Sequence, residues 1–226
     1  MLHSIQQRYG EKLRASDGEI GQVRDFYFDD KNWTVRYLVA DTGGWLSGRL
    51  VLISPHALGH LYPEGKVLLV NLTRQQIEDS PSIDEHMPVS RQLEEEYHRH
   101  YGYAYYAESM PLWGLGGYPV LAPPPLETDA KQQGVDAHLR SARVMAGYNV
   151  AANDGVVGEV TDFLIDGRTW VIREIVVECG HWYSGRKAVI STDKVSRISH
   201  DQSTVYVDAT KHAFRDALDQ PQGSPA

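Results

Sequence analysis

Residues 17–29 have the sequence DGEIGQVRDFYFD, and residues 154–166 have the sequence DGVVGEVTDFLID. Both stretches follow the pattern Asp-Gly-x-x-Gly-x-Val-x-Asp-Phe-x-x-Asp, where x is any residue. The match continues without a gap from Asp17 to Ser80 and from Asp154 to Ala217, at a constant offset of 137 positions, with twenty identities in 64 pairs. A fixed-period match of this length indicates a tandem duplication, so we expect two copies of one module.

The length of each copy favours a compact domain over a solenoid repeat. Each copy spans roughly 80 residues, enough for a small core, whereas solenoid repeats run roughly 20 to 50 residues. The chain of 226 residues is 42% hydrophobic and 23% charged, which is within the globular range. We therefore predict compact domains at 1–80 and 138–220, a linker at 81–137 and a disordered tail at 221–226.

Composition also bears on the compartment. Cys179 is the single cysteine, so an intramolecular disulfide is excluded and a reducing compartment is favoured. The residues after Met1 contain no apolar stretch of the length that a signal peptide needs. The mean hydropathy of −0.41 leaves no room for a membrane span. We expect a cytoplasmic protein without a transmembrane segment.

The net charge of −8 is concentrated between the two copies. Residues 1–80 carry 9 Lys/Arg against 10 Asp/Glu, residues 138–226 carry 10 against 11, and residues 81–137 carry 3 against 9. The sequence has no basic stripe that could neutralise a row of phosphates. This pattern argues against direct nucleic-acid binding, whose affinity comes largely from counterion release.

Within each copy, apolar residues recur with a period of two, as in half-buried strands. Asp-Gly pairs and other turn residues separate these short runs. The expected strands lie near 12–16, 19–29, 33–41, 49–53 and 66–71, and near 149–153, 156–166, 170–178, 186–191 and 203–208.

A short helix is expected at the end of each copy. Thr73 and Thr210 are good N-caps, and Ile77 and Phe214 would dock the helices on the sheet. Short antiparallel strands with regular turns favour a small closed or partly open barrel, because closure removes exposed edges. The predicted fold class is mainly β, with two small barrels in tandem, each closed by a short helix and joined by an acidic, aromatic linker.

Two repeated residue types give sharper expectations. Gly21 and Gly158 occupy strand positions where a side chain is otherwise favoured, which indicates a bulge or a close backbone crossing. Trp33 and Trp170 lead equivalent strands, and we expect both to be partly buried.

Taken in order, these motifs resemble the PRC-barrel domain. The resemblance rests on the Asp-Gly-x-x-Gly-x-Val-x-Asp-Phe string, the Trp-led strand and the turns that end in Gly48-Arg49 and Gly185-Arg186. It implies the β-barrel shared by the cytoplasmic part of the photosynthetic reaction-centre H subunit and the C-terminal domain of the ribosome-maturation factor RimM. Pro55 follows the family pattern, but Thr192 stands at the equivalent position of the second copy, which predicts a looser turn there.

The departures from these two relatives limit the functional inference. The H subunit begins with a transmembrane helix, and RimM has a different N-terminal domain, whereas this chain has a second barrel motif in that place. The resemblance is therefore to stand-alone, soluble PRC-barrel proteins, which are more similar to adaptor modules than to enzymes.

The predicted linker is unusually aromatic. Ser90 is a candidate N-cap for a helix reaching His100. The aromatic residues that follow are Tyr101, Tyr103, Tyr105, Tyr106, Trp113 and Tyr118. Such a density is typical of interface cores rather than flexible tethers, so the segment is predicted to form a homodimer. Packing within the groove between its own two barrels is the alternative.

The candidate partner-binding residues are arginines and aromatic residues. They are Trp45 and Arg49 in the first copy, Trp182 and Arg186 in the second, and Tyr101, Tyr105 and Trp113 in the linker. An exposed guanidinium after a glycine could bind a carboxylate or phosphate of a partner. The alternative is a hairpin arginine that covers its neighbouring tryptophan ring.

Other suggestive residues favour structural roles. His98 and His100 beside Glu94–Glu96 could bind a divalent metal, but closed metal sites need three or four converging ligands, so a solvated helix face is favoured. The pairs Asp25/Asp29 and Asp162/Asp166 are too far apart along a strand for acid–base work and are predicted to cap turns. We predict no catalytic residue, cofactor or metal site, because nucleotide, phosphate-loop and hydrolase motifs are missing.

Two functional hypotheses remain. The favoured one is a non-enzymatic adaptor that binds a protein partner. The alternative is a ligand- or metal-binding protein, or a cryptic enzyme, with a site between the two barrels.

Overall fold

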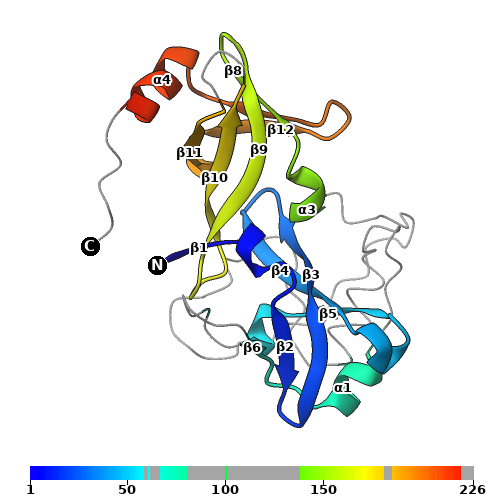
Figure 1. The fold of residues 1–226 in the computed structure, drawn as a ribbon. Coiled ribbons are helices and arrows are strands. Elements are labelled where there is room, and N and C mark those ends of the chain that lie inside the picture. The colour runs from blue at the N-terminus through cyan, green and yellow to red at the C-terminus, as the bar shows by residue number, and fades with distance from the viewer. Residues whose placement is uncertain (59–60, 62–66, 81–99, 101–137, 181–184, 220–226) are drawn as a thin grey trace, which may run out of the picture.

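The computed structural model describes residues 1–58, 61, 67–80, 100, 138–180 and 185–219. These residues form two lobes, each built mainly from one sequence copy, which meet end to end (Figure 1). No helix in the described part of the chain has the length and apolar character that a membrane crossing requires.

The first lobe is a twisted antiparallel sheet with one parallel pair. Its strands are β2 (Lys12–Ala15), β3 (Gly18–Asp29), β4 (Thr34–Asp41), β5 (Leu50–Ile53) and β6 (Val67–Leu69), in the spatial order β5-β4-β3-β2-β6. Its short helices are η2 (Gly43–Leu46), η3 (Pro55–Ala57) and α1 (Arg74–Glu78).

The second lobe repeats this order and adds one strand. Its strands are β8 (Asn149–Ala152), β9 (Gly155–Asp166), β10 (Ile172–Cys179), β11 (Lys187–Ser191), β12 (Val195–Ser199) and β13 (Thr204–Val207), in the order β11-β10-β9-β8-β13-β12. Its helices are η5 (Thr192–Lys194) and α4 (Lys211–Asp219). The equivalent strand orders confirm the duplication predicted from the offset.

The sequence predicted closed or partly open barrels, and the structure shows two mainly β modules whose sheets do not close into barrels. Within the described residues, no ladder joins β5 to β6 or β11 to β12, the strands at the ends of the two orders. β2 covers the first part of β3, and a strand from the other copy covers its last part. The sheet therefore continues into the neighbouring lobe rather than closing on itself.

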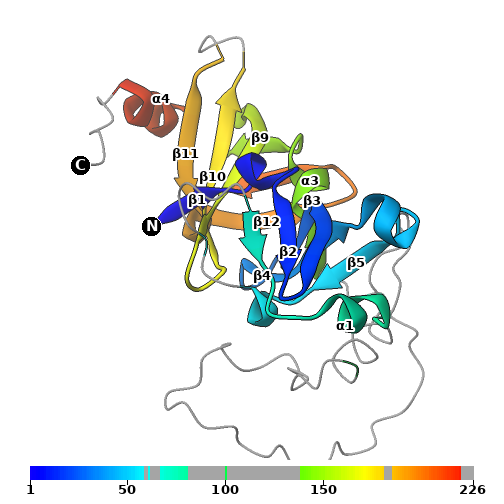
Figure 2. The ribbon, with the colours of Figure 1, turned by 60° about the horizontal axis from the view of Figure 1, so that its bottom comes forward.

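The two copies exchange their N-terminal strands. β1 (Leu2–Ser4) pairs with β9 of the second lobe, and β7 (Leu139–Ser141) pairs with β3 of the first. A short helix follows each exchanged strand, η1 (Gln6–Arg8) after β1 and α3 (Ala142–Met145) after β7. Because β1 and β7 are themselves 137 positions apart, the exchange is reciprocal about a pseudo-twofold axis. Figure 1 shows β1 crossing to β9, and Figure 2 shows the same junction from below.

The main hydrophobic core runs through both lobes, where we had expected one core in each domain, and a smaller cluster is formed by Tyr37, Val39, Leu52 and Leu139. At the junction, the ring of Phe28 lies 5.6 Å from that of Phe163 and stacks on Trp33 at 5.5 Å. Trp33 is partly buried, as predicted, whereas Trp170 is 5% exposed and so more deeply buried than predicted. The cores of the two lobes merge because of the strand exchange. Each lobe has apolar side chains at the junction that only the other lobe covers.

The predicted helix signals are confirmed. Thr73 forms a capping box with Gln76 at the start of α1, and the backbone N–H of Ala213 donates to Thr210 Oγ1 at the start of α4. Ile77 and Phe214 are both buried.

The close backbone crossings at Gly21 and Gly158 are also confirmed. A Cβ at Gly21 would lie 2.0 Å from the carbonyl oxygen of Asp41, and one at Gly158 would lie 2.0 Å from that of Glu178. Gly21 also has φ +131, which disfavours any side chain. The strand pairing beside each glycine contains a register shift.

Candidate functional site

The carboxylate of Asp25 holds the exchanged strand β7 on the first lobe. Asp25 Oδ2 accepts a hydrogen bond from Ser141 Oγ at 2.5 Å, and Oδ1 accepts from the backbone N–H groups of Arg143 and Phe26. Ser141 is at the same time the N-cap of α3. Burial raises the pKa of Asp25, although the Ser141 and backbone hydrogen bonds and the charge of Arg143 act in the opposite direction.

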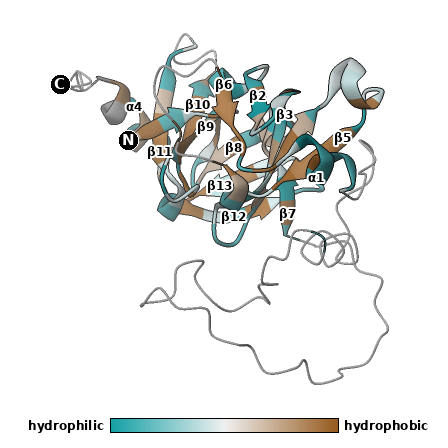
Figure 3. Cartoon of the chain, turned by 90° about the horizontal axis from the view of Figure 1, so that it is seen from below, coloured by the Kyte–Doolittle hydropathy of each residue, from teal (hydrophilic) through white to brown (hydrophobic). Residues whose placement is uncertain are grey.

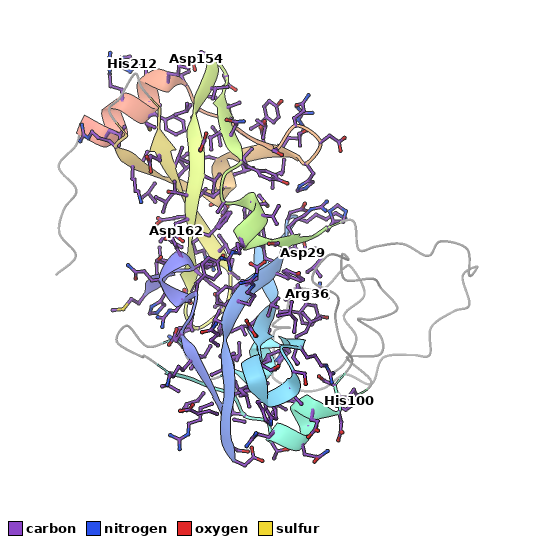
Figure 4. The ribbon with its side chains drawn as sticks, turned by 45° about the vertical axis from the view of Figure 1, so that its right-hand side comes forward. Asp29, Arg36, His100, Asp154, Asp162 and His212 are labelled. Carbon is purple, nitrogen blue, oxygen red and sulfur yellow. The ribbon has the colours of Figure 1, made fainter. Side chains whose placement is uncertain are left out.

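Asp162 makes the equivalent contacts in the second lobe. Its Oδ2 accepts from Ser4 Oγ at 2.5 Å, and its Oδ1 accepts from the backbone N–H groups of Gln6 and Phe163. Figure 4 labels Asp162 where β9 meets the N-terminal segment. The aspartates of the repeated motif therefore cap backbone groups, as predicted, but the groups at Asp25 and Asp162 belong largely to the other copy.

The two tryptophans add a second reciprocal pair of bonds. Val35 N–H donates to the carbonyl of Trp170 at 2.9 Å, and Ile172 N–H donates to that of Trp33 at 2.7 Å. Both tryptophans have positive φ, 54° and 57°, which costs an L-residue roughly 1 kcal/mol. The left-handed turn directs the carbonyl of Trp170 at the start of β4 and that of Trp33 at the start of β10.

One flank of the junction carries a charged cluster that has no counterpart on the other. Asp30, in the turn after β3, accepts hydrogen bonds from His138 Nδ1 on Oδ1 and from Arg140 Nε and His200 Nε2 on Oδ2, each at 2.9 Å. Burial alone would raise the pKa of Asp30, but these three bonds and the charge of Arg140 lower it below the usual value. The Asp30 cluster joins the first lobe, β7 and the β12–β13 hairpin. The Tyr148 hydroxyl lies 3.5 Å from His200 Nδ1.

The opposite flank is packed differently. Gly167 stands where Asp30 does, and a side chain there would meet the ring of His3 at 2.6 Å. His3 Nδ1 lies 3.1 Å from Arg8 Nη2, and Arg8 in turn forms a buried ion pair with Glu11 at 3.0 Å. Burial, with the nearby Arg8 charge, lowers the pKa of His3.

The chemistry of the junction is structural. The carboxylates of Asp25, Asp30 and Asp162 all accept hydrogen bonds from groups that join one segment to another. No three histidine, cysteine or acidic side chains among the described residues are arranged to hold a metal ion. Cys179 is buried, and burial raises the pKa of its thiol, so it lacks the exposed thiolate character of a reactive cysteine.

Arg49 fastens the end of α1 to the sheet. Its Nη1 donates to the carbonyl of Glu78 at 2.8 Å and its Nη2 donates to the carbonyl of Ser80. Arg74, rather than Arg49, covers the ring of Trp45, with its guanidinium carbon 4.4 Å from the ring centroid. Trp45 itself is half-buried.

Arg186 plays the same part in the second lobe, where its Nη2 donates to the carbonyl of Leu218 in α4. Trp182, Tyr101, Tyr105 and Trp113 lie outside the described residues, as do the predicted homodimer segment and His98. His100 Nε2 lies 3.0 Å from the carbonyl of Gln76 in α1 (Figure 4). Any partner that bound Arg49 or Arg186 through its guanidinium would compete with helix carbonyls.

The sequence reasoning missed the strand exchange and the Asp30 cluster. Leu2 and Ser4 are repeated as Leu139 and Ser141 at the same offset, which shows that the copies begin upstream of the matched block but does not show which copy these strands join. No comparable signal pointed to Asp30, whose partners lie 108, 110 and 170 positions away in the chain.

Comparison with known proteins agrees with the repeat. A family model described as the PRC-barrel domain matches residues 10–77 and again residues 142–213. A protein of Deinococcus radiodurans, described as uncharacterized, is 31% identical over 94 residues, which cover 36% of this chain and 34% of that protein. The chain thus matches about a third of the length of this relative. Since the two matched segments make up more than half of the chain and coincide with the two lobes, the protein belongs to the PRC-barrel domain family, with two copies in tandem.

Proposed function

We propose that the protein is a non-enzymatic adaptor that binds a protein partner on the outer faces of its lobes. The observation that carries this proposal is how three carboxylates at the junction, one buried and two partly buried, are used. Asp25, Asp30 and Asp162 each accept at least two hydrogen bonds from within the chain, so they serve to fix one lobe against the other. A catalytic or ligand-binding carboxylate needs acceptor capacity that is directed at a substrate.

Strand exchange supports the same proposal. The lobes are joined by two reciprocal strand pairings, by the hydrogen bonds of Trp33, Trp170, Asp25 and Asp162, and by a shared core. Their outer faces therefore keep a fixed separation. A fixed separation suits a scaffold, because a partner that contacts both lobes pays little ordering entropy on the adaptor side.

The outer faces differ although the exchanged strands of the junction are equivalent. The exposed large apolar side chains of the first lobe include Val67 and Leu69 on β6, whereas those of the second include Val156 and Val189 on other strands. An adaptor of this kind presents two different surfaces and so suits a partner assembly that is itself asymmetric.

Crosslinking of the full chain in its source cell, followed by quantitative mass spectrometry, tests the proposal. We expect a protein recovered in near-stoichiometric amount, together with no loss of binding after dialysis against a chelator. Native mass spectrometry that found a stoichiometric metal or small molecule, and no protein partner, would overturn it in favour of a ligand-binding protein.

Self-association through the aromatic segment stays part of the proposal. Light scattering at micromolar concentration should give a mass near twice the 25.4 kDa of one chain. Deletion of residues 101–118 should return the mass to that of one chain while both lobes remain folded. A wild-type mass of one chain would remove the homodimer and leave the adaptor proposal in place.

A further inference from the structure

The outer face of the first lobe carries an apolar pair beside two cations. β6 pairs in parallel with β2, with Val67 opposite Lys12 and Leu69 opposite Arg14. All four side chains are exposed and alternate with the buried Leu13 and Leu68, so they lie on one face. Figure 3 shows the hydrophobic β6 next to the hydrophilic β2. We call these four residues the β2–β6 patch.

The apolar members of the patch are exposed, and its charged members form no ion pair with any other described residue. Leu69 is 57% exposed and Val67 41% exposed, which is unusual for neighbouring large apolar residues on a strand. The structure shows no ion pair for Lys12 or Arg14 among the described residues, even though Glu19 on β3 stands opposite Arg14.

The same position in the second lobe is polar and internally bonded. Thr204 and Tyr206 replace the apolar pair, and Asn149 and Ala151 replace the cations. The Tyr206 ring is covered by Arg197 at 4.2 Å, and its hydroxyl donates to Gln202 Oε1 at 2.6 Å. The two copies therefore share these strands but differ in the chemistry of this face.

We propose that the β2–β6 patch binds an acidic amphipathic helix of a partner protein. An apolar stripe on such a helix would cover Val67 and Leu69, and carboxylates along the border of the stripe would meet Lys12 and Arg14. Charge complementarity selects this occupant: two unpaired cations beside two apolar side chains match a stripe flanked by Glu or Asp. The inference rests on the proposed adaptor function and specifies one of its surfaces.

An extended anionic surface fits the patch less well. The chain carries a net charge of −8, which repels a membrane or nucleic acid at distances beyond the patch itself. A helix of about four turns contacts only the patch and its neighbours, within roughly one Debye length of Lys12 and Arg14. A short acidic helix therefore needs only the two cations of the patch, whereas an extended anionic surface needs a wide basic face, and residues 1–80 carry 9 Lys/Arg against 10 Asp/Glu.

Fluorescence anisotropy with the full chain tests the assignment. The probe is a labelled helical peptide of about sixteen residues, with Leu at positions i, i+3, i+4 and i+7 and Glu on both sides of this stripe. We expect saturable binding, weakened about tenfold by Lys12→Glu with Arg14→Glu, and about fivefold by Leu69→Ser. A peptide with Gln in place of Glu should lose most of the affinity and its salt dependence.

The matched control is Lys187→Glu with Val189→Ser on β11 of the second lobe. These two residues are also an exposed cation and an exposed valine on one face of a strand, but Lys187 pairs in register with the exposed Glu178. The control variant should bind the peptide as the wild-type chain does. Thermal melts of all variants show whether any lost binding reflects unfolding.

Three results would overturn the assignment: no peptide binding by a folded wild-type chain, equal loss in the β11 control, or stronger binding to phosphatidylserine vesicles than to the peptide. If a stoichiometric protein partner is nevertheless recovered by crosslinking, the adaptor function stands and only the surface is wrong. If the wild-type chain binds no peptide and crosslinking recovers no protein partner, both proposals fail.

Discussion

The two copies are most alike where they touch each other and least alike where they face away. At the junction, Asp25 and Asp162 make the same contacts with the opposite copy, and the tryptophan carbonyls exchange equivalent bonds. On the outer faces, a basic and apolar patch in the first lobe stands where the second has a hydroxyl-rich one. The comparison indicates that the duplication preserved a self-complementary interface, as a homodimer of single modules would need, and left the surfaces to diverge.

The junction itself diverges only at its two flanks. On one flank Asp30 binds two histidines and an arginine, and on the other Gly167 makes room for the ring of His3. A twofold axis places equivalent residues in equivalent surroundings, so this difference became accessible only after the two modules were fused in one chain.

The largest expected effect tests the close crossings that the copies share. Gly21→Ala and Gly158→Ala should each destabilise the protein by about 3 kcal/mol or more, because the new Cβ would meet a backbone carbonyl at 2.0 Å and no flexible side chain can yield. Gly21→Ala should cost more, since Gly21 also has φ +131. Urea unfolding measures both.

Gly44→Ala is the control for these variants. Nothing lies within 4 Å of a Cβ at Gly44, and its φ is not positive, so its unfolding midpoint should match that of the wild type. An unchanged midpoint in the Gly158 variant would contradict the crossing that the structure shows.

The second prediction breaks the reciprocal exchange on one side at a time. Asp25→Ala and Asp162→Ala each leave a serine hydroxyl and backbone N–H groups without their acceptor, at a cost of about 2–3 kcal/mol. Asp25→Ala should be the more severe, because Asp25 is buried and Asp162 is only partly so. The corresponding Asn variants keep an amide oxygen as acceptor and should lose less.

Calorimetry of these variants also tests the shared core. Because one core runs through both lobes, either variant should shift a single transition rather than one of two. Two separate transitions, with only the mutated copy affected, would show that the lobes fold independently.

The third prediction concerns the asymmetric flank and its pH dependence. The folded pKa of Asp30 is lowered from its ordinary value of 3.8, so the folded state binds this proton less tightly than the unfolded state. The stabilisation by Asp30 is present above pH 3.8 and is lost as the pH falls through the folded pKa. Asp30→Asn should therefore cost about 1 kcal/mol at pH 7, allowing for solvent screening, and little at the acid end.

Denaturant melts of wild type and Asp30→Asn between neutral and acid pH provide the measurement. The effect of pH on the stability contributed by Asp25 has the opposite sign. Because the folded pKa of Asp25 is raised, its contribution to the free energy of unfolding grows as the pH falls toward 3.8. Asp25→Asn thus serves as the contrasting variant. A difference between wild type and Asp30→Asn that grew on acidification would refute the direction assigned to Asp30.

The smallest expected effect on stability concerns the two arginines that hydrogen-bond to α1 and α4. Arg49→Ala and Arg186→Ala should each cost about 1 kcal/mol, since Arg49 donates to two carbonyls at the end of α1 and Arg186 donates to the carbonyl of Leu218 in α4. Hydrogen exchange of the α1 and α4 amides reports each loss locally. If the amides of α1 and α4 exchanged as slowly in the variants as in the wild type, the helix-binding role would be contradicted. The partner-binding role suggested by the sequence would then be favoured for both arginines.

Several features were decided by the sequence alone. The gapless offset predicted two equivalent strand orders, because turns of equal length impose equal connections. The repeated Gly21 and Gly158 predicted a backbone crossing, because only glycine tolerates it, and Thr73 with Ile77 predicted the start and the buried side of α1. These signals can be read from the sequence, since each depends either on residues that are close in the chain or on the constant offset between the two copies.

Only the tertiary structure decided which copy each segment completes. A strand such as β1 has the same alternation whether it pairs with its own copy or with the other, because the pattern specifies a face and not a partner. The exchange explains why the predicted cores merge. The sheets are open at a different place, because no ladder among the described residues joins β5 to β6 or β11 to β12. The Asp30 cluster depended on tertiary structure even more, because an ion pair between residues more than 100 positions apart leaves no periodicity in the sequence.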